Sequence, residues 1–183
     1  MLSSIRQGFK CGGGTLVFKP CDSWISFALD SSSALSSADF QTQLTFVSNA
    51  IYEINHAERL QLLSVNGSLA NWYGPFSIPY IQSRMINSTI QNGEFNLNAT
   101  LSAIYTSYAQ TFAVSNSHIG AIVFVSDTSS PSNYEGADNV VNILKTLGFR
   151  FTFILMGPNV NQTFNPQPDN WDSAYLKAYA CPT

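Results

Sequence analysis

Charged residues are scarce in this chain. They make up 10% of its 183 residues, against roughly 25% in an average soluble domain. The 8 Lys and Arg residues are scattered and the formal net charge is -3, whereas nucleic-acid binding needs a clustered basic surface. No apolar run reaches the roughly 20 residues that cross a bilayer. We therefore expect neither a nucleic-acid partner nor a membrane span.

Sequence motifs of common enzyme classes are also missing. The chain has no Gly-x-Ser-x-Gly around a hydrolase nucleophile, and no Gly-x-Gly-x-x-Gly for a dinucleotide cofactor. Only His56 and His118 could act as general bases, and we interpret both as surface residues. An α/β hydrolase or transferase is an alternative, but we expect no enzyme activity.

Only three cysteines are present, and they flank the predicted core. Cys11 and Cys21 precede the first predicted strand, and Cys181 lies close to the end of the sequence. A disulfide between Cys21 and Cys181 would close the domain into one loop, which the chain-entropy model credits with roughly 5 kcal/mol. The alternative is three unrelated buried thiols. We favour the disulfide, which leaves Cys11 to pair with a segment beyond this sequence.

With so few charges, solubility must come from hydroxyls, amides and glycans. Four N-x-S/T sequons occur, close to the roughly three that this composition gives by chance; they begin at Asn66, Asn87, Asn98 and Asn161. Together with the cysteines, they lead us to expect an extracellular, secreted glycoprotein. Met1 to Lys10 lacks the apolar core of a signal peptide, so we interpret the sequence as a fragment.

Two apolar runs that end in an aspartate predict the centre of a sheet. Trp24 to Leu29 precede Asp30, and Ala121 to Val125 precede Ser126 and Asp127. Continuous apolar runs of this length are typical of parallel strands with helices on both faces. The carboxyl ends of such strands meet at one edge of the sheet, where open parallel sheets bind ligands.

Helical periodicity separates the predicted strands. Apolar residues recur at helical spacing in three stretches, which predict helices at residues 36–54, 97–108 and 140–147. A further short helix is expected at residues 80–90. We expect Gln43 on an outward face of the first helix and Gly148 at the end of the last. The expected inward residues of these two helices are Phe40, Leu44, Val47, Ile51, Ile54, Val140, Ile143, Leu144 and Leu147.

A predicted hairpin adds an antiparallel edge strand. Arg59 to Val65 and Leu69 to Phe76 read as strands joined at Asn66-Gly67, a pair strongly favoured in two-residue hairpins. Trp72-Tyr73 then lies on the edge strand, and Trp171 lies near the end. Such aromatic residues could anchor a partner, but we expect them to pack against neighbouring loops.

The expected fold class is therefore α/β: a doubly wound, mostly parallel sheet with one antiparallel edge strand and helices on both faces. Further buried strands are expected at Ile119 to Ser126 and Phe151 to Met156. A chain of 183 residues suits one domain, which we place at residues 21–181. Residues 1–20, with their triple glycine, read as a linker or the tail of a preceding module.

The order of these elements resembles that of the von Willebrand factor type A (VWA) domain, over about Asp22 to Met156. The resemblance rests on a strand ending in Asp-x-Ser-x-Ala, a hairpin to an edge strand, and a later strand ending in Asp. In that family an Asp-x-Ser-x-Ser motif joins a Thr and an Asp from two other loops to hold a metal ion. The resemblance implies a Rossmann-like fold and a recognition or adhesion role.

The matched residues depart from the metal motif at two positions. Asp30 and Ser32 match the first two ligands, and Asp127 matches the last acidic ligand. Ala34 replaces the second Ser, and Asn98 replaces the Thr. Mg²⁺ prefers about six oxygen ligands, and alanine offers none. We expect no cofactor, and a weak Mg²⁺ or Mn²⁺ site is the alternative.

Asp30 and Ser32 also have an explanation that involves no metal. Short polar side chains at these positions could simply cap the turn and the helix that follows. This interpretation is the one we favour.

Three functions are compatible with these observations. We favour a secreted recognition module that binds a protein or glycan partner without metal. By resemblance, such degenerate VWA domains occur in multi-domain extracellular proteins, some with C-type lectin modules, so we expect this chain to be part of a longer one. The second function is metal-dependent adhesion, which a metal titration separates from the first. The third is a hydrolase-type enzyme.

Peptide mapping of secreted, non-reduced protein tests the predicted disulfide. We expect a linked pair of peptides containing Cys21 and Cys181, because this bridge would tie the terminal segment, which is poor in apolar residues, to the first strand. Free thiols at both positions would contradict the pairing.

Overall fold

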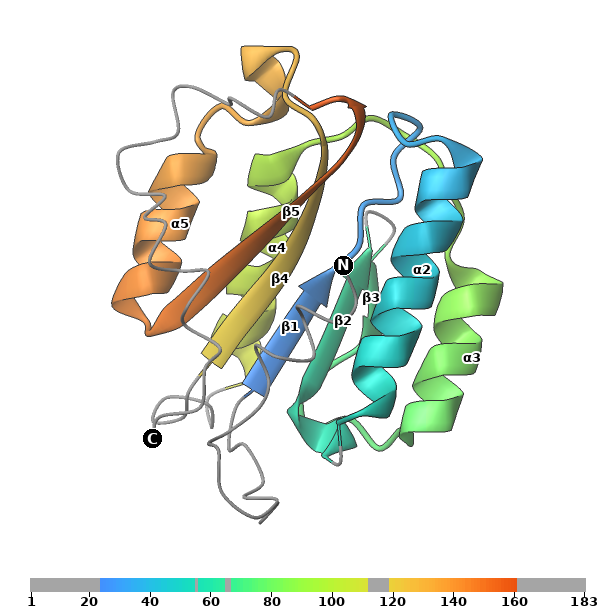
Figure 1. Cartoon of the computed structure of the whole chain (residues 1–183). Helices are drawn as coiled ribbons and strands as arrows, with labels where there is room; N and C mark the ends of the chain where they lie inside the picture. The colour runs from blue at the N-terminus through green and yellow to red at the C-terminus, as the bar shows by residue number, and fades with distance from the viewer. Residues whose placement is uncertain (1–23, 55, 65–66, 112–118, 161–183) are drawn as a thin grey trace, which may run out of the picture.

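The computed structural model describes residues 24–54, 56–64, 67–111 and 119–160. In this part of the chain a five-stranded sheet has the order β3-β2-β1-β4-β5 (Figure 1). Its strands are β1 (Trp24–Ala28), β2 (Leu60–Ser64), β3 (Gly67–Ala70), β4 (Ile119–Asp127) and β5 (Phe149–Asn159). All neighbouring strands pair in parallel except β3, which runs antiparallel to β2. The predicted mostly parallel sheet with an antiparallel edge strand is confirmed.

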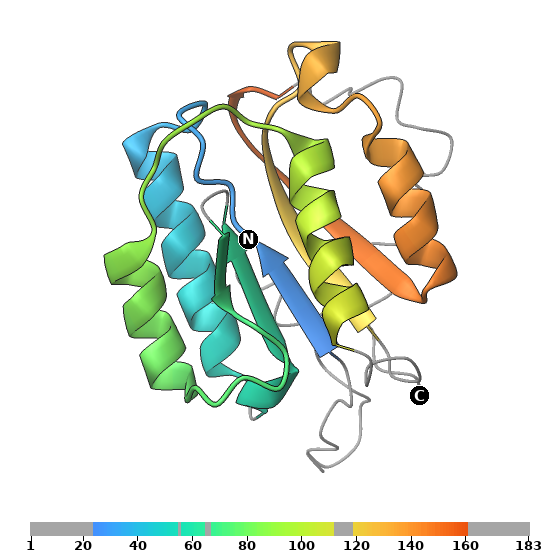
Figure 2. The ribbon, with the colours of Figure 1, turned by 180° about the vertical axis from the view of Figure 1, so that it is seen from behind.

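Helices cover both faces of the sheet, as Figures 1 and 2 show from opposite sides. One face carries α2 (Ser37–Tyr52) and α3 (Ile78–Ser88), and the other carries α4 (Leu97–Gln110) and α5 (Ala137–Thr146). Two short 3-10 turns, η1 (Ala57–Arg59) and η2 (Pro131–Asn133), complete the described elements. None of the described helices has the length and apolar character of a bilayer-spanning segment. The predicted doubly wound arrangement is confirmed.

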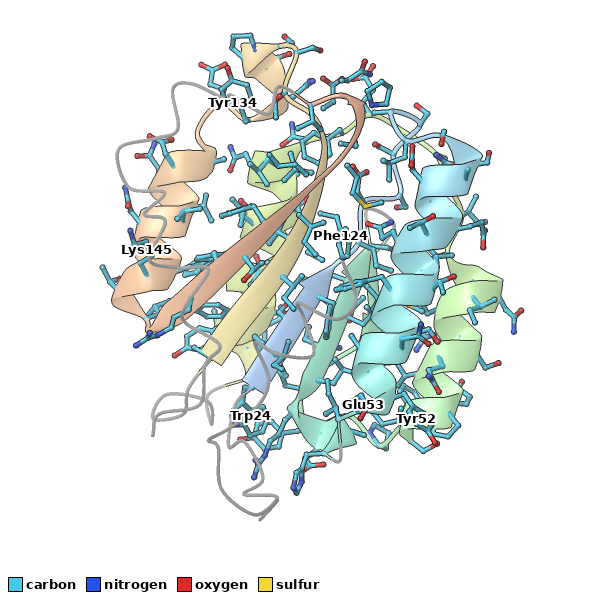
Figure 3. The ribbon with its side chains drawn as sticks, in the orientation of Figure 1. Trp24, Tyr52, Glu53, Phe124, Tyr134 and Lys145 are labelled. Carbon is cyan, nitrogen blue, oxygen red and sulfur yellow. The ribbon has the colours of Figure 1, made fainter. Side chains whose placement is uncertain are left out.

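The two central strands are buried on both faces because their side chains alternate between two apolar clusters. Phe27 of β1 and Phe124 of β4 belong to the cluster under α2 and α3. Ala28 and Val123 belong to the cluster under α4 and α5. Phe124, labelled in Figure 3, lies 5.9 Å from the ring centre of Phe46 of α2 in an edge-to-face contact. Two-sided burial explains the continuous apolar runs in the sequence.

Helix α2 begins and packs as its sequence predicts, with one exception. The Ser36 side chain accepts a hydrogen bond from Asp39 N (3.1 Å) and donates one to Asp39 Oδ2 (2.8 Å), so Ser36 caps the amino end of the helix. The inward stripe is confirmed at Phe40, Leu44, Val47 and Ile51. The outward placement of Gln43 was wrong, because its amide is fully buried and bonds to main-chain atoms beyond β1.

The predicted edge strand at Leu69 to Phe76 was too long. Strand β3 ends at Ala70, and a tight turn follows, in which Gly74 N donates to Asn71 O (3.0 Å). Trp72 is therefore buried, as expected of a packing residue, and its indole N–H donates to Ile25 O (3.4 Å). Tyr73 is 47% exposed.

The last helix and strand also differ in detail from expectation. In α5 the buried residues are Ala137, Val141 and Leu144, whereas Ile143 is 47% exposed, so its inward placement was wrong. Gly148 follows the C-cap residue Leu147 and has a φ of +93°, as expected of a terminating glycine. Strand β5 is longer than predicted and only partly buried, because it pairs with β4 alone in the described chain. The residues outside the described ranges include Cys11, Cys21, Asn66, His118, Asn161, Trp171 and Cys181.

Replacement of Leu44 by alanine tests the assigned core face of α2. Leu44 is 3% exposed, and truncation of a buried leucine costs about 2 to 5 kcal/mol. We expect the Leu44→Ala melting temperature to fall by several degrees. Gln41→Ala, an exposed change in the same helix, is the control and should melt like the unmodified chain. Equal melting temperatures for both variants would show that the helix face is misassigned.

Candidate functional site

The loops after β1 and β4 meet at the carboxyl edge of the sheet, as the sequence predicts. The two strands are parallel neighbours, with Ala28 opposite Val123. Strand order reverses between them, because the chain passes from β1 to β2 on one side and returns to β4 on the other. The side chains of Ser32 and Ser126 lie in contact here, with their Oγ atoms 3.3 Å apart. This corner is the topological switch point at which such sheets bind ligands.

Asp30 is held inside this corner by hydrogen bonds of its own loop. Its side chain is buried, and Oδ1 accepts from Ser32 N (2.8 Å). The side-chain amide of Gln43 in α2 makes two hydrogen bonds to the main chain of Asp30. Asp30 N donates to Gln43 Oε1 (2.8 Å), and Gln43 Nε2 donates to Asp30 O (2.7 Å). Asp30 Oδ2 is buried without a hydrogen-bond partner in the described chain.

The connection between α3 and α4 covers the loop after β1. Figure 2 shows this connection crossing the carboxyl edge of the sheet. Asn92 N donates to Ser31 O (2.7 Å). Gln91 Nε2 donates to Leu35 O (2.6 Å) and to Ser32 O (3.1 Å). Ser31 and Ser32 are fully buried as a result.

The end of β5 closes the same corner from the other side. Thr128 N donates to Asn159 O (3.1 Å). Gly157 has a φ of +92°, and a Cβ there would stand 3.4 Å from Leu35 Cδ2. Figure 1 shows the tip of β5 beside the loop that follows β1. The corner is therefore covered by the chain on both sides.

The two remaining residues of the metal motif also use their side chains locally. Asn98, half-buried in the first turn of α4, accepts from Ser102 Oγ at its Oδ1 (3.3 Å). Its Nδ2 packs closely on Gly136: a Cβ added to this glycine would stand 2.9 Å from the Asn98 Nδ2 atom. Asp127 Oδ1 accepts from both the N and the Oγ of Ser129 (2.8 and 2.6 Å).

The corner offers fewer side-chain oxygens than the intact motif would offer to a dication, which prefers about six oxygen ligands. Each of the four matched residues, Asp30, Ser32, Asn98 and Asp127, has a side-chain oxygen engaged by its own surroundings. Ala34 contributes no side-chain oxygen. The described ranges also contain no group of three or more His, Cys, Asp or Glu side chains placed to hold a metal ion.

A hollow of about 180 Å³ lies beside this corner, at the carboxyl ends of β1 and β2. Its lining includes Ala28, Leu63, Ser64, Asn96 and Thr100, and none of the residues matched to the metal motif. Asn96 caps α4 by accepting from Ala99 N (2.8 Å). This hollow and the covering role of Gln91 and Asn92 could not be predicted from the sequence, because neither feature produces a periodic pattern.

His56 lies at the opposite end of the sheet from Ser32, because it precedes η1 and β2. Figure 3 shows that opposite end at Trp24, Tyr52 and Glu53, while Tyr134 lies at the carboxyl edge. The imidazole Nδ1 of His56 is 2.8 Å from Glu58 Oε1. A hydrogen bond from its own backbone lowers the pKa of Glu58, and the neighbouring His56 adds to this shift. His56 cannot serve Ser32 as a base.

Comparison with solved structures finds the same fold in VWA-domain proteins. Manganese-loaded Plasmodium vivax TRAP protein matches with a TM-score of 0.61 and 17% identity, over 80% of this chain and 61% of that one. Two crystal forms of proximal thread matrix protein 1 from the mussel byssus match with TM-scores of 0.65 and 0.62, at 13% and 15% identity. Both matches span 87% of this chain and 41% of that protein.

These likenesses establish a VWA-like fold. This chain spans less than two thirds of the length of each of these proteins. No protein-family model and no curated protein matches the sequence.

Removal of the Gln43 amide tests whether it holds the loop after β1. Gln43→Ala would leave the buried N–H and C=O of Asp30 without partners, and each unsatisfied group costs about 1 to 3 kcal/mol. We expect a lower melting temperature and faster amide exchange at Asp30. Asn49→Ala, an exposed change in the same helix, should alter neither. Unchanged exchange at Asp30 in Gln43→Ala would contradict the assigned role.

Proposed function

We propose that this chain is an extracellular recognition module that binds a protein or glycan partner without a metal ion and without catalysis. The observation that carries the proposal is the closure of the carboxyl-edge corner by the chain's own hydrogen bonds, from Gln43, Gln91 and Asn92. The VWA-like fold supports a binding role by analogy, since such folds serve as scaffolds for sites rather than defining a reaction.

We propose metal-independent binding because the side chains matched to the metal motif already make hydrogen bonds within the chain. The Asp30–Ser32, Asn98–Ser102 and Asp127–Ser129 hydrogen bonds engage one side-chain oxygen of each matched residue, so a dication would compete with them for part of its ligand set. It would then still lack an oxygen at position 34. Manganese-loaded TRAP protein shares the fold, but its low identity to this chain transfers no ligand set.

We propose the absence of catalysis because of where Ser32, the possible nucleophile, and His56, the possible base in the described chain, lie. Ser32 is fully buried under the α3–α4 connection, so a substrate could not reach its hydroxyl. A general base must lie within hydrogen-bond reach of the proton that it removes, and His56 lies at the other end of the sheet. The hydroxyl contact of Ser32 is with Ser126 instead.

Metal-dependent adhesion is the second candidate, and one observation favours it. Asp30 Oδ2 is buried and has no hydrogen-bond partner in the described chain. A buried carboxylate oxygen without a partner is costly, and a cation would relieve that cost. This function would require the loop after β1 to rearrange.

The proposed extracellular location is supported by an accessible sequon. Asn87 is exposed on α3, and its Nδ2 makes a single hydrogen bond, to Ser83 Oγ (3.2 Å). The Nδ2 of Asn98, in contrast, packs toward Gly136. Since a glycan is attached at Nδ2, we place it at Asn87 in preference to Asn98.

A metal titration followed by thermal melting separates the two candidates. We expect millimolar Mg²⁺ or Mn²⁺ to leave the melting temperature of the unmodified chain unchanged. A ligand at a hundred times its dissociation constant would add about 2.7 kcal/mol of stability, which a melt detects. The double variant Ala34→Ser with Asn98→Thr restores two hydroxyls and should gain a metal-dependent rise.

The decisive control is Asp30→Ala in both backgrounds. It should abolish any rise seen in the double variant. If the unmodified chain is stabilised by metal and Asp30→Ala removes that effect, metal-dependent adhesion replaces the proposal.

A further inference from the structure

A second hollow lies at the other end of the molecule, between β3, the turn after it and α3. Its volume is about 210 Å³, and its lining includes Ser68, Asn71, Gly74, Phe76 and Arg84. The turn lies at the amino edge of the sheet, since Tyr73 N donates to Glu58 O (2.7 Å) just before β2 begins. The hollow is therefore separate from the corner between β1 and β4.

Arg84 is the cationic group of this hollow, and the fold holds its side chain in place. Its Nη1 donates to Leu69 O (2.9 Å), and its guanidinium carbon lies 5.7 Å from the ring centre of Phe76. Tyr80 stacks on Phe76 with ring centres 4.7 Å apart, which fixes the aromatic ring. The guanidinium is therefore positioned before any ligand arrives.

Arg84 has no acidic partner in the described chain. The described ion pairs join Glu58 to His56 and to Arg59. A guanidinium has five N–H donors, and Arg84 uses one of them on Leu69 O. The remaining donors and the positive charge are available in a half-buried setting, where a charge-assisted hydrogen bond is stronger than in water.

Asn71 adds further donors to the same hollow. Its Oδ1 accepts from Ser68 Oγ (2.5 Å), so the amide presents its Nδ2 donors. The turn that carries Asn71 is tight, because a Cβ on Gly74 would stand only 2.7 Å from Asn71 O. Tyr73 in the same turn adopts a φ of +57°, an unusual conformation for a residue other than glycine that often marks a functional site.

We propose that this hollow, termed the Arg84 pocket, binds the side-chain carboxylate of an Asp or Glu on a partner protein. A planar carboxylate matches the guanidinium fork in charge and geometry. One cation suits a singly charged group better than a phosphate. At about 210 Å³ the pocket is smaller than the roughly 300 to 1,000 Å³ of typical small-molecule sites, which suits one acidic side chain better than a sugar ring. The inference rests on the proposed recognition function and gives it a location.

Amide NMR of the isotope-labelled chain tests the Arg84 pocket with small probes. The probe is N-acetyl-glutamate N-methylamide, and the neutral control is N-acetyl-glutamine N-methylamide. We expect the glutamate probe to shift the amide signals of Leu69, Asn71 and Gly74, and the glutamine probe to leave them unchanged. Equal shifts with both probes, or no shift with the glutamate probe, would overturn the proposal.

Three variants make the result specific. Arg84→Gln keeps a polar side chain but has no charge and no guanidinium fork, so the shifts should disappear. Arg84→Lys keeps the charge without the fork and should weaken binding by about tenfold. Arg150 is an exposed residue of β5, which lies at the other end of the strand order from β3. Arg150→Gln therefore removes one charge far from the pocket and should leave the shifts intact. Shifts that persist in Arg84→Gln would overturn the assignment.

A further arm uses N-acetylneuraminic acid, a carboxylate carried by glycans. If this sugar shifts the same signals and the glutamate probe does not, the protein-carboxylate proposal is overturned. These readouts do not depend on metal. Failure of the Arg84 pocket therefore leaves metal-independent recognition to be judged by the melting experiment alone.

Discussion

Burial of β1 on both faces is the constraint on which the rest of this structure depends. Phe27 packs under α2 and Ala28 packs under α4, with parallel strands on either side. The loops after β1 and β4 therefore emerge together from an apolar sheet, and both carry polar residues close to the strand end. Because a polar group buried without a partner costs several kcal/mol, the chain must satisfy these loops itself.

Gln43 of α2 and Gln91 and Asn92 of the connection that crosses the carboxyl edge provide hydrogen-bond partners for the loop after β1. Their hydrogen bonds close the corner in which a sheet of this topology ordinarily binds its ligand. The proposed function rests on this closure: we propose that recognition takes place on exposed surface, without an ion in the corner. The Arg84 pocket offers such a surface at the opposite edge, where a held guanidinium lacks an acidic partner in the described chain.

The sequence predicted those features that depend on periodicity or on adjacent residues. Examples are the apolar run of β1, the stripe from Phe40 to Ile51 and the cap at Ser36. It failed at Gln43, because the partner of that amide is main chain 13 residues away. The closure of the corner could not be predicted either, because the residues that cover it come from segments far apart in sequence. The position of Arg84 over a cavity likewise depends on how α3 packs against β3.

Paramagnetic broadening by Mn²⁺ tests the closed corner most directly, because it reports the position of a bound ion rather than its effect on stability. Amide signals of Ser31, Ser32, Asn98 and Asp127 would be followed while Mn²⁺ is added to the unmodified chain. A corner closed by its own hydrogen bonds predicts no selective broadening of these signals at millimolar Mn²⁺. Selective broadening at micromolar Mn²⁺, reversed by excess Mg²⁺, would contradict metal-independent recognition.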